Sequence, residues 1–421
     1  MLEFLWYIPS AVILLSFLYG VPSFYSVLRN LKDFVWLKVT NGNNQDSSPS
    51  RTIKVAIVVP LYMEDERAVE ETFKSIARQR YEIVRPDVYV VLEKEDKETL
   101  NIVFKYIDVL TEKDLDVYVF VNGDRRKTKA SSINALLKFI SNLYEAVTIF
   151  DGGDKVLDER YVEKATKLIV RGYCVIGAKV YRAGYNIIGK LSYIDTILWY
   201  EVGLPGIAKI VGAPPVSGEG LTVSMKFLTA VGGFPEVLAE DAYLSILAAR
   251  HGCGIGLLDT VILEGAPMNL RSMVKQRMRW YRGYIECLKH TLTRHRRYLD
   301  KKTIMLLTYT YLQPVALTAP FIAIVILAVV PFVKVPAVVV TLAKIELISI
   351  ATAPMYLVLT RKLLDPVIVL VPLHWIFQGA IALAALMPVK VSWMRTLQRS
   401  YISSHDIKIR ATSSIQTLKY M

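Results

Sequence analysis

Acidic and aromatic side chains follow two short apolar runs of the sequence. Residues 55–60 lead to Tyr62 and Glu64, and residues 88–92 lead to Glu93. Such side chains could stack on a nucleoside and hydrogen-bond to it. The plainer interpretation is a pair of solvated turns, in which acidic residues are common. The nucleoside hypothesis requires that the two segments converge on one cavity.

A basic cluster follows the third apolar run, residues 117–121. It comprises Arg125, Arg126, Lys127 and Lys129, and a predicted helix begins directly after it. Backbone N–H groups at a helix start and lysine ammonium groups both attract phosphate, so the cluster could hold a diphosphate. An ordinary exposed basic loop is the alternative.

A fourth apolar run, residues 147–150, leads to the acidic segment Asp151-Gly152-Gly153-Asp154. Two carboxylates with glycines between them let the backbone approach a ligand closely, which suits a divalent metal that bridges phosphate oxygens. The expected ions are Mg²⁺ and Mn²⁺. A glycine-containing acidic turn without a metal is the alternative.

Adjacent carboxylates at Glu240 and Asp241 precede a predicted helix over residues 242–249. Beside a bound donor, Asp241 could be the general base that removes the proton from an acceptor hydroxyl. The competing role for Asp241 is to cap the N-terminus of that helix.

A basic helix is predicted around residues 273–282. At about 100° per residue, Met273, Val274, Met278, Trp280, Tyr281, Tyr284, Ile285 and Leu288 share one face, and Lys275, Arg279, Arg282 and Lys289 share the other. Such a helix should lie in a membrane interface. Trp280 could also form a platform for a sugar ring, and interface anchoring alone is the alternative.

The elements that position these residues alternate between apolar runs and helical stretches. Residues 174–180 form a fifth run, and residues 68–78 and 130–143 show apolar side chains at three-to-four-residue spacing. Continuous apolar runs suit strands buried on both faces. The pattern predicts an α/β fold with a doubly wound, mostly parallel sheet, whose ligands bind beyond the carboxyl ends of the strands.

Hydrophobic segments flank this region and predict a membrane protein. Residues 4–28 are long enough to cross a bilayer, and three further apolar stretches cover residues 304–333, 335–360 and 366–388. A cleaved signal peptide is the alternative for the first segment, although its start lacks a positive region. We therefore predict an N-terminal transmembrane helix, a linker, a catalytic domain, an interface helix, three transmembrane helices and a basic tail, with boundaries at 1–30, 31–50, 51–267, 268–300, 301–390 and 391–421.

Two charged residues, Lys344 and Glu346, lie inside one of these apolar stretches. Charges at that depth are unfavourable in lipid, so both are expected to face protein or a polar cavity. Four spans with a cytosolic catalytic domain would leave the basic tail outside, against the positive-inside tendency. Either one stretch does not span, or the tail lies on the interface.

The composition and net charge of the chain restrict the classes of molecule that it could bind. The chain has 421 residues and a net charge of +13, which suits a lipid surface, a nucleic acid or a phosphorylated substrate. The densest basic run, residues 294–297, adjoins a predicted span, so anionic lipid is favoured over nucleic acid. Three widely spaced cysteines, Cys174, Cys253 and Cys287, indicate neither a disulfide framework nor a zinc site, and fit a reducing cytosolic location.

The order of these motifs resembles the family-2 glycosyltransferases, and within them the membrane branch of cellulose synthase-like and hyaluronan synthase-like enzymes. The resemblance covers residues 54–282, and its most specific part is the pairing of Glu240-Asp241 with Gln276-x-x-Arg279-Trp280. It implies a nucleotide-sugar transferase domain of the GT-A type. Two departures are visible: two glycines separate the acidic residues where the family has Asp-x-Asp, and Glu93 stands where Asp is usual.

The resemblance also implies roles for individual residues. Tyr62, Glu64 and Glu93 would hold the nucleoside, Lys129 the diphosphate, Asp151 and Asp154 the metal-diphosphate, and Glu240 with Asp241 the catalytic centre, with Asp241 as the base. Gln276, Arg279 and Trp280 would bind the diphosphate and the acceptor terminus. Attack from the face opposite the leaving nucleotide inverts the anomeric centre.

The leading functional hypothesis is a polymerising β-glycan synthase that uses a UDP- or GDP-sugar, since Gln-x-x-Arg-Trp in this family marks chain extension. With four predicted spans a channel within one subunit is tight, so a homo-oligomer or a partner is a further expectation. A second hypothesis is single-sugar transfer to a lipid-phosphate or glycolipid acceptor. A third, from another class, is a transporter with a non-catalytic nucleotide-binding domain.

Overall fold

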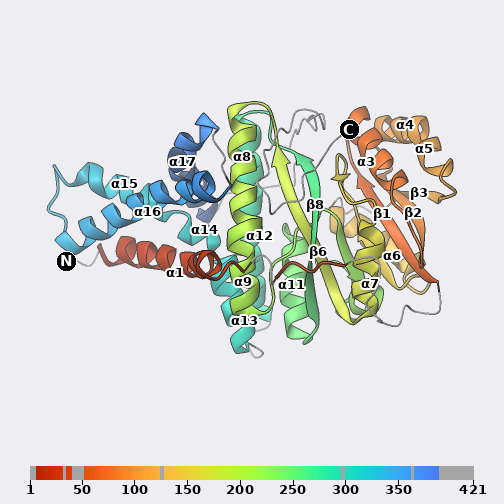
Figure 1. Ribbon diagram of the computed structural model, residues 1–421, viewed down its shortest axis with the longest axis horizontal. Helices are drawn as coiled ribbons and strands as arrows, with labels where there is room; N and C mark the ends of the chain where they lie inside the picture. Colours follow the sequence, from red (N-terminus) through yellow and green to blue (C-terminus); the bar gives the residue numbers. More distant parts are fainter. Residues whose placement is uncertain are drawn as a thin grey trace.

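A computed structural model describes residues 6–31, 35–39, 52–123, 128–294, 299–361 and 365–387 of the chain. Its described part consists of a helix-covered sheet on one side and a group of apolar helices on the other, with two helices between them (Figure 1). These are α8 (Ile187–Leu198) and α12 (Leu270–Arg294). Of the linker predicted over residues 31–50, residues 35–39 are described and dock on the sheet, where Leu37 forms a parallel bridge with Leu258, so this part is not a free linker. Residues 40–50 and the basic tail lie outside the described residues.

The sheet has eight strands in the order β3-β2-β1-β4-β7-β6-β8-β5. The strand bounds are β1 Ile53–Leu61, β2 Val84–Glu93, β3 Asp116–Asn122, β4 Ala146–Ile149, β5 Lys155–Val156, β6 Tyr173–Ala183, β7 Leu221–Ser224 and β8 Gly254–Gly265. Parallel pairing joins β1 to β2 and β4, β2 to β3, and β6 to β8, whereas β7 runs antiparallel to β4 and β6. The mostly parallel α/β sheet predicted from the five apolar runs is confirmed.

Side chains of the central strand alternate between two hydrophobic cores. In β1, Val55, Ile57 and Val59 pack on one face of the sheet, and Ala56 and Val58 pack on the other. The first face is covered by α3 (Glu66–Ala77), α4 (Lys97–Tyr106), α5 (Asp108–Thr111) and α7 (Tyr161–Val170). The second is covered by α6 (Lys129–Ile140), α10 (Met225–Val231) and α11 (Glu240–Arg250). This double cover explains why the strands read as continuous apolar runs.

A disulfide joins Cys174 to Cys253, so the prediction of no disulfide was wrong for this pair. The two cysteines are 79 residues apart in sequence, but their Cα atoms lie 5.9 Å apart. They come together because β6 and β8 are neighbouring parallel strands, with Tyr173 paired to Gly254. Cys287 is buried and free. The cysteine count therefore no longer supports a reducing location.

Three helices of the described part are long and apolar enough to cross a membrane: α1 (Tyr7–Arg29), the α16 segment Ala337–Thr360, and the segment Pro366–Leu386, which contains α17 (Val371–Leu386). A fourth span is possible in length if the bent pair Lys301–Tyr311 and Gln313–Val329, which meet at 41°, counts as one. The pair contains α13 (Lys301–Leu306), α14 (Gln313–Ala316) and α15 (Ala319–Val329). These helices indicate a membrane-associated protein.

The two charged residues of α16 (Ala337–Arg361) have different surroundings. Glu346 is 2% exposed and accepts a hydrogen bond of 3.0 Å from the Ser16 hydroxyl of α1, as predicted for a charge facing protein. Lys344 is exposed, so the same prediction was wrong for it. Two positions along a helix differ by about 200°, so the two side chains leave opposite faces. A lysine at such a site can extend its ammonium toward the lipid headgroups.

Candidate active site

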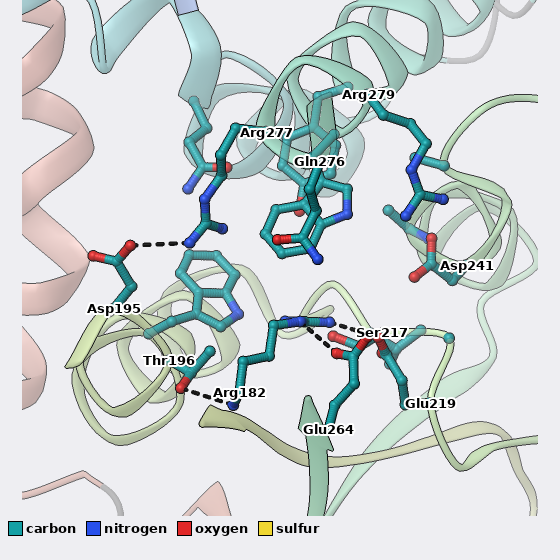
Figure 2. A pocket seen from close by; sticks show the side chains of 18 of the residues that line it. Arg182, Asp195, Thr196, Ser217, Glu219, Asp241, Glu264, Gln276, Arg277 and Arg279 are labelled. Atoms are coloured by element: carbon teal, nitrogen blue, oxygen red, sulfur yellow. Dashed lines mark hydrogen bonds and ion pairs between the residues drawn. The ribbon is translucent and has the colours of Figure 1, made fainter. Parts of the chain in front are cut away.

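A cavity of about 680 Å³ lies where the carboxyl ends of the strands meet α12 and the membrane helices. Figure 2 shows part of it, with side chains of α12 above the ends of β6 and β8. The position is the one expected for ligands of a doubly wound sheet. Ten of the eleven candidate residues named from the sequence line it: Tyr62, Glu64, Glu93, Lys129, Asp151, Glu240, Asp241, Gln276, Arg279 and Trp280.

The end of β1 is held by contacts with α4 and with the acidic turn. Met63 adopts a left-handed backbone with φ of 52°, and its N–H donates to the Asp96 carboxylate. The N–H of Glu64 donates to the Thr99 hydroxyl at 3.0 Å. A Cβ added to Gly152 would lie 2.8 Å from the Glu64 carboxyl carbon, so glycine is required for this close approach. Tyr62 and Glu64 are thereby fixed at the cavity wall.

Glu93, at the end of β2, is 7% exposed and belongs to a buried polar cluster. Its carboxylate accepts hydrogen bonds from the Asn122 amide at 3.2 Å and from the Ser132 hydroxyl. Such donors offset the cost of burying a polar side chain. The side chain can offer the cavity only the part of its carboxylate that these donors leave free.

Lys129 is the first residue of α6 and forms an ion pair with Asp151 across the cavity, with 2.6 Å between Nζ and Oδ1. A capping box between Thr128 and Ser131 fixes the helix start and hence the lysine. Burial favours the neutral amine, but Asp151 and Glu240 outweigh it and raise the pKa of Lys129. The ammonium therefore stays charged beside the acidic turn. Arg125, Arg126 and Lys127, the rest of the predicted basic cluster, lie outside the described residues.

Asp154, the eleventh candidate, does not line the cavity. Its side chain is fully buried, and its Oδ2 accepts the Asp151 N–H at 2.9 Å, so it closes the Gly152–Gly153 turn from within. Burial and the Asp151 charge raise the pKa of Asp154 well above its usual range. Among the described residues, no group of three His, Cys, Asp or Glu side chains could hold a metal. Of the two acidic residues in this motif, only Asp151 is placed to bind a cation in the cavity. Oxygen atoms of the substrate would have to supply the other ligands of that cation.

Glu240 and Asp241 lie in the first turn of α11, whose N-cap position is Ala239. Burial, followed by the neighbouring Asp241, raises the pKa of Glu240 to about 7. Burial, followed by the Glu219 carboxylate, raises the pKa of Asp241. Asp241 is thus not the N-cap residue, and the raised pKa of each carboxylate makes both more ready to accept a proton than a solvent-exposed carboxylate.

The loop before α11 is anchored by Asn134 of α6. The Asn134 amide donates to the Phe234 carbonyl at 2.8 Å and accepts the Phe234 N–H at 2.7 Å. Gly233 has φ of 96°, and a Cβ there would come within 2.6 Å of Asn134 Oδ1. The Gly-Gly-Phe-Pro segment thus follows a path that a side chain at position 233 would obstruct, and α11 starts from a fixed point.

Arg182, Glu219 and Glu264 form a buried ion-pair cluster that was not predicted. Arg182 Nη2 lies 2.5 Å from Glu219 Oε1, and Arg182 Nε lies 2.5 Å from Glu264 Oε2. The Trp280 ring lies against two cations, Arg182 at 4.6 Å and Arg277 at 4.5 Å from the ring centroid. The tryptophan is consequently locked in orientation by cation–π contacts.

The helix α12 presents a different face to the protein than its apolar pattern predicts. Gln276 and Arg277 are buried, at 1% and 6% exposure, although neither belongs to the predicted apolar face. Arg279, assigned to the polar face, reaches from α12 toward Asp241 (Figure 2). Within the described part of the chain, Gln276 Oε1 and Arg279 Nε are buried without a hydrogen-bond partner. The helix therefore directs unsatisfied polar groups into the cavity.

Asp195 of α8 links α12 to the membrane helix α17. Its carboxylate accepts from Arg277 at 3.0 Å, Trp375 at 2.9 Å and Gln378 at 2.9 Å, and it lies 2.8 Å from His374 Nε2. Burial acts in the opposite direction, but His374 and Arg277 lower the pKa of Asp195 to about 2. This network fixes Arg277 beside Trp280.

Of the site residues that were not predicted, the sequence could have indicated Arg182 but neither Glu264 nor Asp195. Arg182 lies two residues after the fifth apolar run and pairs across the ladder with Glu264 of β8, so both lie at carboxyl ends of parallel strands. The rule of inspecting residues after each run would have found Arg182. Glu264 was missed because β8 was not predicted, and Asp195 because its partners are far away in sequence.

Comparisons with known proteins agree with this arrangement. The family model described as "Glycosyl transferase family group 2" matches residues 147–394, more than half of the chain. The fold is similar to the mannosyltransferase PcManGT from Pyrobaculum calidifontis, solved in complex with GDP-Man and Mn²⁺, with a TM-score of 0.59 and 20% identity over 89% of this chain and 97% of that one.

A weaker likeness, with a TM-score of 0.41 and 16% identity over 79% of this chain and 91% of that one, is to residues 1–349 of TarS from S. aureus. No curated protein matches the sequence directly.

Proposed function

Since the chain belongs to glycosyl transferase family group 2, we propose that it transfers a sugar from a nucleotide-diphosphate sugar to an acceptor hydroxyl at the membrane surface, with inversion at the anomeric carbon. One observation carries the proposal: Lys129, Asp241, Arg279 and Trp280, from three different elements, line one cavity with the ends of β1 and β2. The catalytic domain is proposed to be cytosolic on a multi-pass membrane protein, and a homo-oligomer is compatible with the proposal.

The donor is proposed to bind along the strand ends. Tyr62, Glu64 and Glu93 would hold the nucleoside, and Lys129 would contact the diphosphate. Arg279 and Gln276 approach the same region from α12, and the unsatisfied atoms Arg279 Nε and Gln276 Oε1 would gain partners there. PcManGT was solved with GDP-Man and Mn²⁺, which supports a nucleotide-diphosphate sugar and a divalent metal as expected ligands.

Asp241 is proposed as the base that deprotonates the acceptor hydroxyl. The hydroxyl oxygen attacks the anomeric carbon while the bond from that carbon to the diphosphate oxygen breaks. Lys129 and Arg279 would stabilise the charge on the departing nucleoside diphosphate. A bound divalent cation would add to this stabilisation, and Asp151 is the residue that would hold it. Asp154 would act through the Asp151 turn rather than as a ligand.

Two candidate functions are compatible with this proposal, and they differ in the length of the product. The sequence Gln276-x-x-Arg279-Trp280 beside Asp241 supports the cellulose synthase-like or hyaluronan synthase-like branch, and hence a processive synthase. Single transfer to a lipid acceptor is supported by the extension of the same cavity among the membrane helices. Labelled donor would give a ladder of soluble polymers in the first case and one lipid-soluble product in the second. A transporter would not need a candidate base beside cationic side chains, so the lining of this cavity does not support that function.

The decisive experiment is a donor screen with the full-length protein in membranes. Release of UDP or GDP is measured from a panel of UDP- and GDP-sugars, with and without Mn²⁺ or Mg²⁺. The proposal expects nucleotide release from at least one donor class, together with transfer of label. Absence of both binding and nucleotide release for every donor, with folded protein, would overturn it.

A further inference from the structure

The cavity extends beyond the transferase domain along one face of α1. Ser16, Tyr19, Gly20, Ser23 and Val27 line it, and their spacing of three or four residues places them on one side of the helix. Across the cavity lie Ala353 and Tyr356 of α16 and Trp375 and Gln378 of α17. A single space therefore joins the candidate base to the interior of the membrane-helix group.

Space along α1 is open where side chains are small. A Cβ added to Gly20 would meet no heavy atom within 4 Å. Two residues further along the same helix the packing is tight, because a Cβ on Gly206 of α9 (Leu204–Val211) would collide with the Pro22 carbonyl. The helix is thus docked tightly on the transferase domain at Pro22 and leaves a groove at Gly20. Phe24, which lines the cavity, is 67% exposed and marks its side toward the lipid.

Measured from Arg29 at the end of α1, the groove reaches about two-thirds of the way across the hydrocarbon core. Thirteen residues separate Ser16 from Arg29, which corresponds to about 20 Å of helix, against roughly 30 Å for the hydrocarbon core. In the described part of α1, Ser16 is the lining residue nearest the N-terminus. Beyond it, Ile13 packs in a closed apolar cluster with Ala323 and Val339. A glycan channel must continue to the far side, whereas a lipid chain needs only this depth.

The charged residues that line the cavity indicate which kind of acceptor head group it can bind. Nine acidic and four basic residues line it, the latter being Lys129, Arg182, Arg277 and Arg279. The first three are paired with carboxylates of the protein. Arg279 remains for the donor diphosphate. An anionic acceptor would meet an excess of carboxylates, and a phosphate nucleophile would need no base. A neutral hydroxyl does need one, and Asp241 is placed to serve it.

We infer that the acceptor is a membrane lipid with an uncharged, hydroxyl-bearing head group, which lies along the α1 groove with its head at Asp241. The inference rests on the proposed transferase function and adds the acceptor class to it. The head-group oxygen bonds to the anomeric carbon, its proton passes to Asp241, and the nucleoside diphosphate leaves. The lipid chain stays between α1, α16 and α17, so the product is a lipid with one added sugar.

The test uses full-length protein in phosphatidylcholine vesicles with labelled donor and four acceptor probes. Two are neutral amphiphiles, dioleoylglycerol and octyl glucoside, one is farnesyl phosphate, and one is soluble cellobiose. Label should enter the organic phase with a neutral amphiphile and should be far weaker with farnesyl phosphate or cellobiose. Preferred transfer to farnesyl phosphate, or a ladder of water-soluble glycans, would overturn the inference.

A variant pair locates the lipid. Gly20→Leu should lower kcat/KM for the neutral amphiphile at least tenfold and leave the Kd of the donor unchanged, because the added side chain fills the groove far from the strand ends. Leu14→Phe, on the exposed side of the same helix, is the control and should have no effect. Equal behaviour of the two variants would contradict the groove assignment.

Failure of this inference differs from failure of the proposed function. If the wild-type protein binds donor and releases nucleotide but glycosylates no neutral amphiphile, the transferase proposal stands and the acceptor class is wrong. If no donor binds and no nucleotide is released under any condition, both fall.

Discussion

The two halves of the cavity are built in different ways. In the half at the strand ends, which we term the donor half, charged side chains are tied to one another: Lys129 to Asp151, and Arg182 to Glu219 and Glu264. In the half along α1, which we term the membrane half, Gly20 faces open space. Transfer chemistry requires charges fixed in advance, because fixed dipoles and charges need no reorganisation during reaction. A lipid chain requires room and little orientation.

Loss of a fixed charge in the donor half should have a large effect. Lys129→Gln removes the ammonium beside Asp151, so we expect kcat to fall about 10²–10³-fold, the range for losing one preorganised donor. Nucleotide release measures it. Lys138→Gln, an exposed position on the same helix, is the control. A Lys129→Gln rate within threefold of wild type would show that this half does not depend on its fixed charges.

The junction between the halves should show an intermediate effect. Asp195→Asn weakens the link between Arg277 of α12 and His374 of α17, so the acceptor side of Trp280 loses its support. We expect about a tenfold loss in kcat/KM for the acceptor, about 1.4 kcal/mol, with the donor Kd unchanged. Asp365→Asn, which alters a more exposed ion pair with Lys190, is the control. Equal losses in donor and acceptor binding would argue for general unfolding of the site instead.

The pH dependence sharpens the description of the donor half. Burial and the Glu219 carboxylate raise the pKa of Asp241, and a base works only when deprotonated, so the rate falls as pH drops through that pKa. Glu219→Gln removes the Glu219 charge and therefore lowers the pKa of Asp241. The acid limb of the kcat profile should therefore move to lower pH. Glu159→Gln, in an exposed ion pair with Arg80, should leave the limb in place, and a shift to higher pH in Glu219→Gln would contradict the assignment.

The smallest effect on activity is expected far from both halves. The disulfide between Cys174 and Cys253 closes a sequence separation of 79 residues. In the chain-entropy account a bond that closes a loop of this length stabilises the folded protein by about 4.5 kcal/mol. Cys174→Ser should lower Tm while kcat at moderate temperature stays near wild type. Reductant should lower the Tm of the wild type and not of the variant, and an equal response of both would show that the bond is not formed in solution.

The donor half and the membrane half also differ in how well the sequence predicted them. Much of the lining of the donor half was predicted, because parallel strands bring their carboxyl ends to one edge and acidic residues such as Glu93 and Asp151 follow the strands there. Asp154 was assigned to the metal from the acidic motif and the family resemblance, yet its side chain turns under the Asp151 loop. Sequence spacing cannot tell which of two acidic residues in a tight turn faces the ligand.

The membrane half was not predicted from sequence. The polar stripe of α1 is interrupted by apolar residues, and its meaning depends on which helices lie opposite. The face of α12 was assigned by hydrophobicity, but Gln276 and Arg277 are buried because the cavity and Asp195 provide polar surroundings. Likewise, the partners of Cys174 and Asp195 are set by strand and helix adjacency over long sequence distances.

The most direct measurement compares Asp241→Asn with the wild type in two assays on the same preparation, donor binding at equilibrium and transfer of labelled sugar to the acceptor. The substitution keeps the size of the side chain and removes its ability to accept a proton from the hydroxyl. We predict a donor Kd within about threefold of wild type and a loss of transfer of about 10²–10⁴-fold. Full transfer activity in Asp241→Asn would contradict the account.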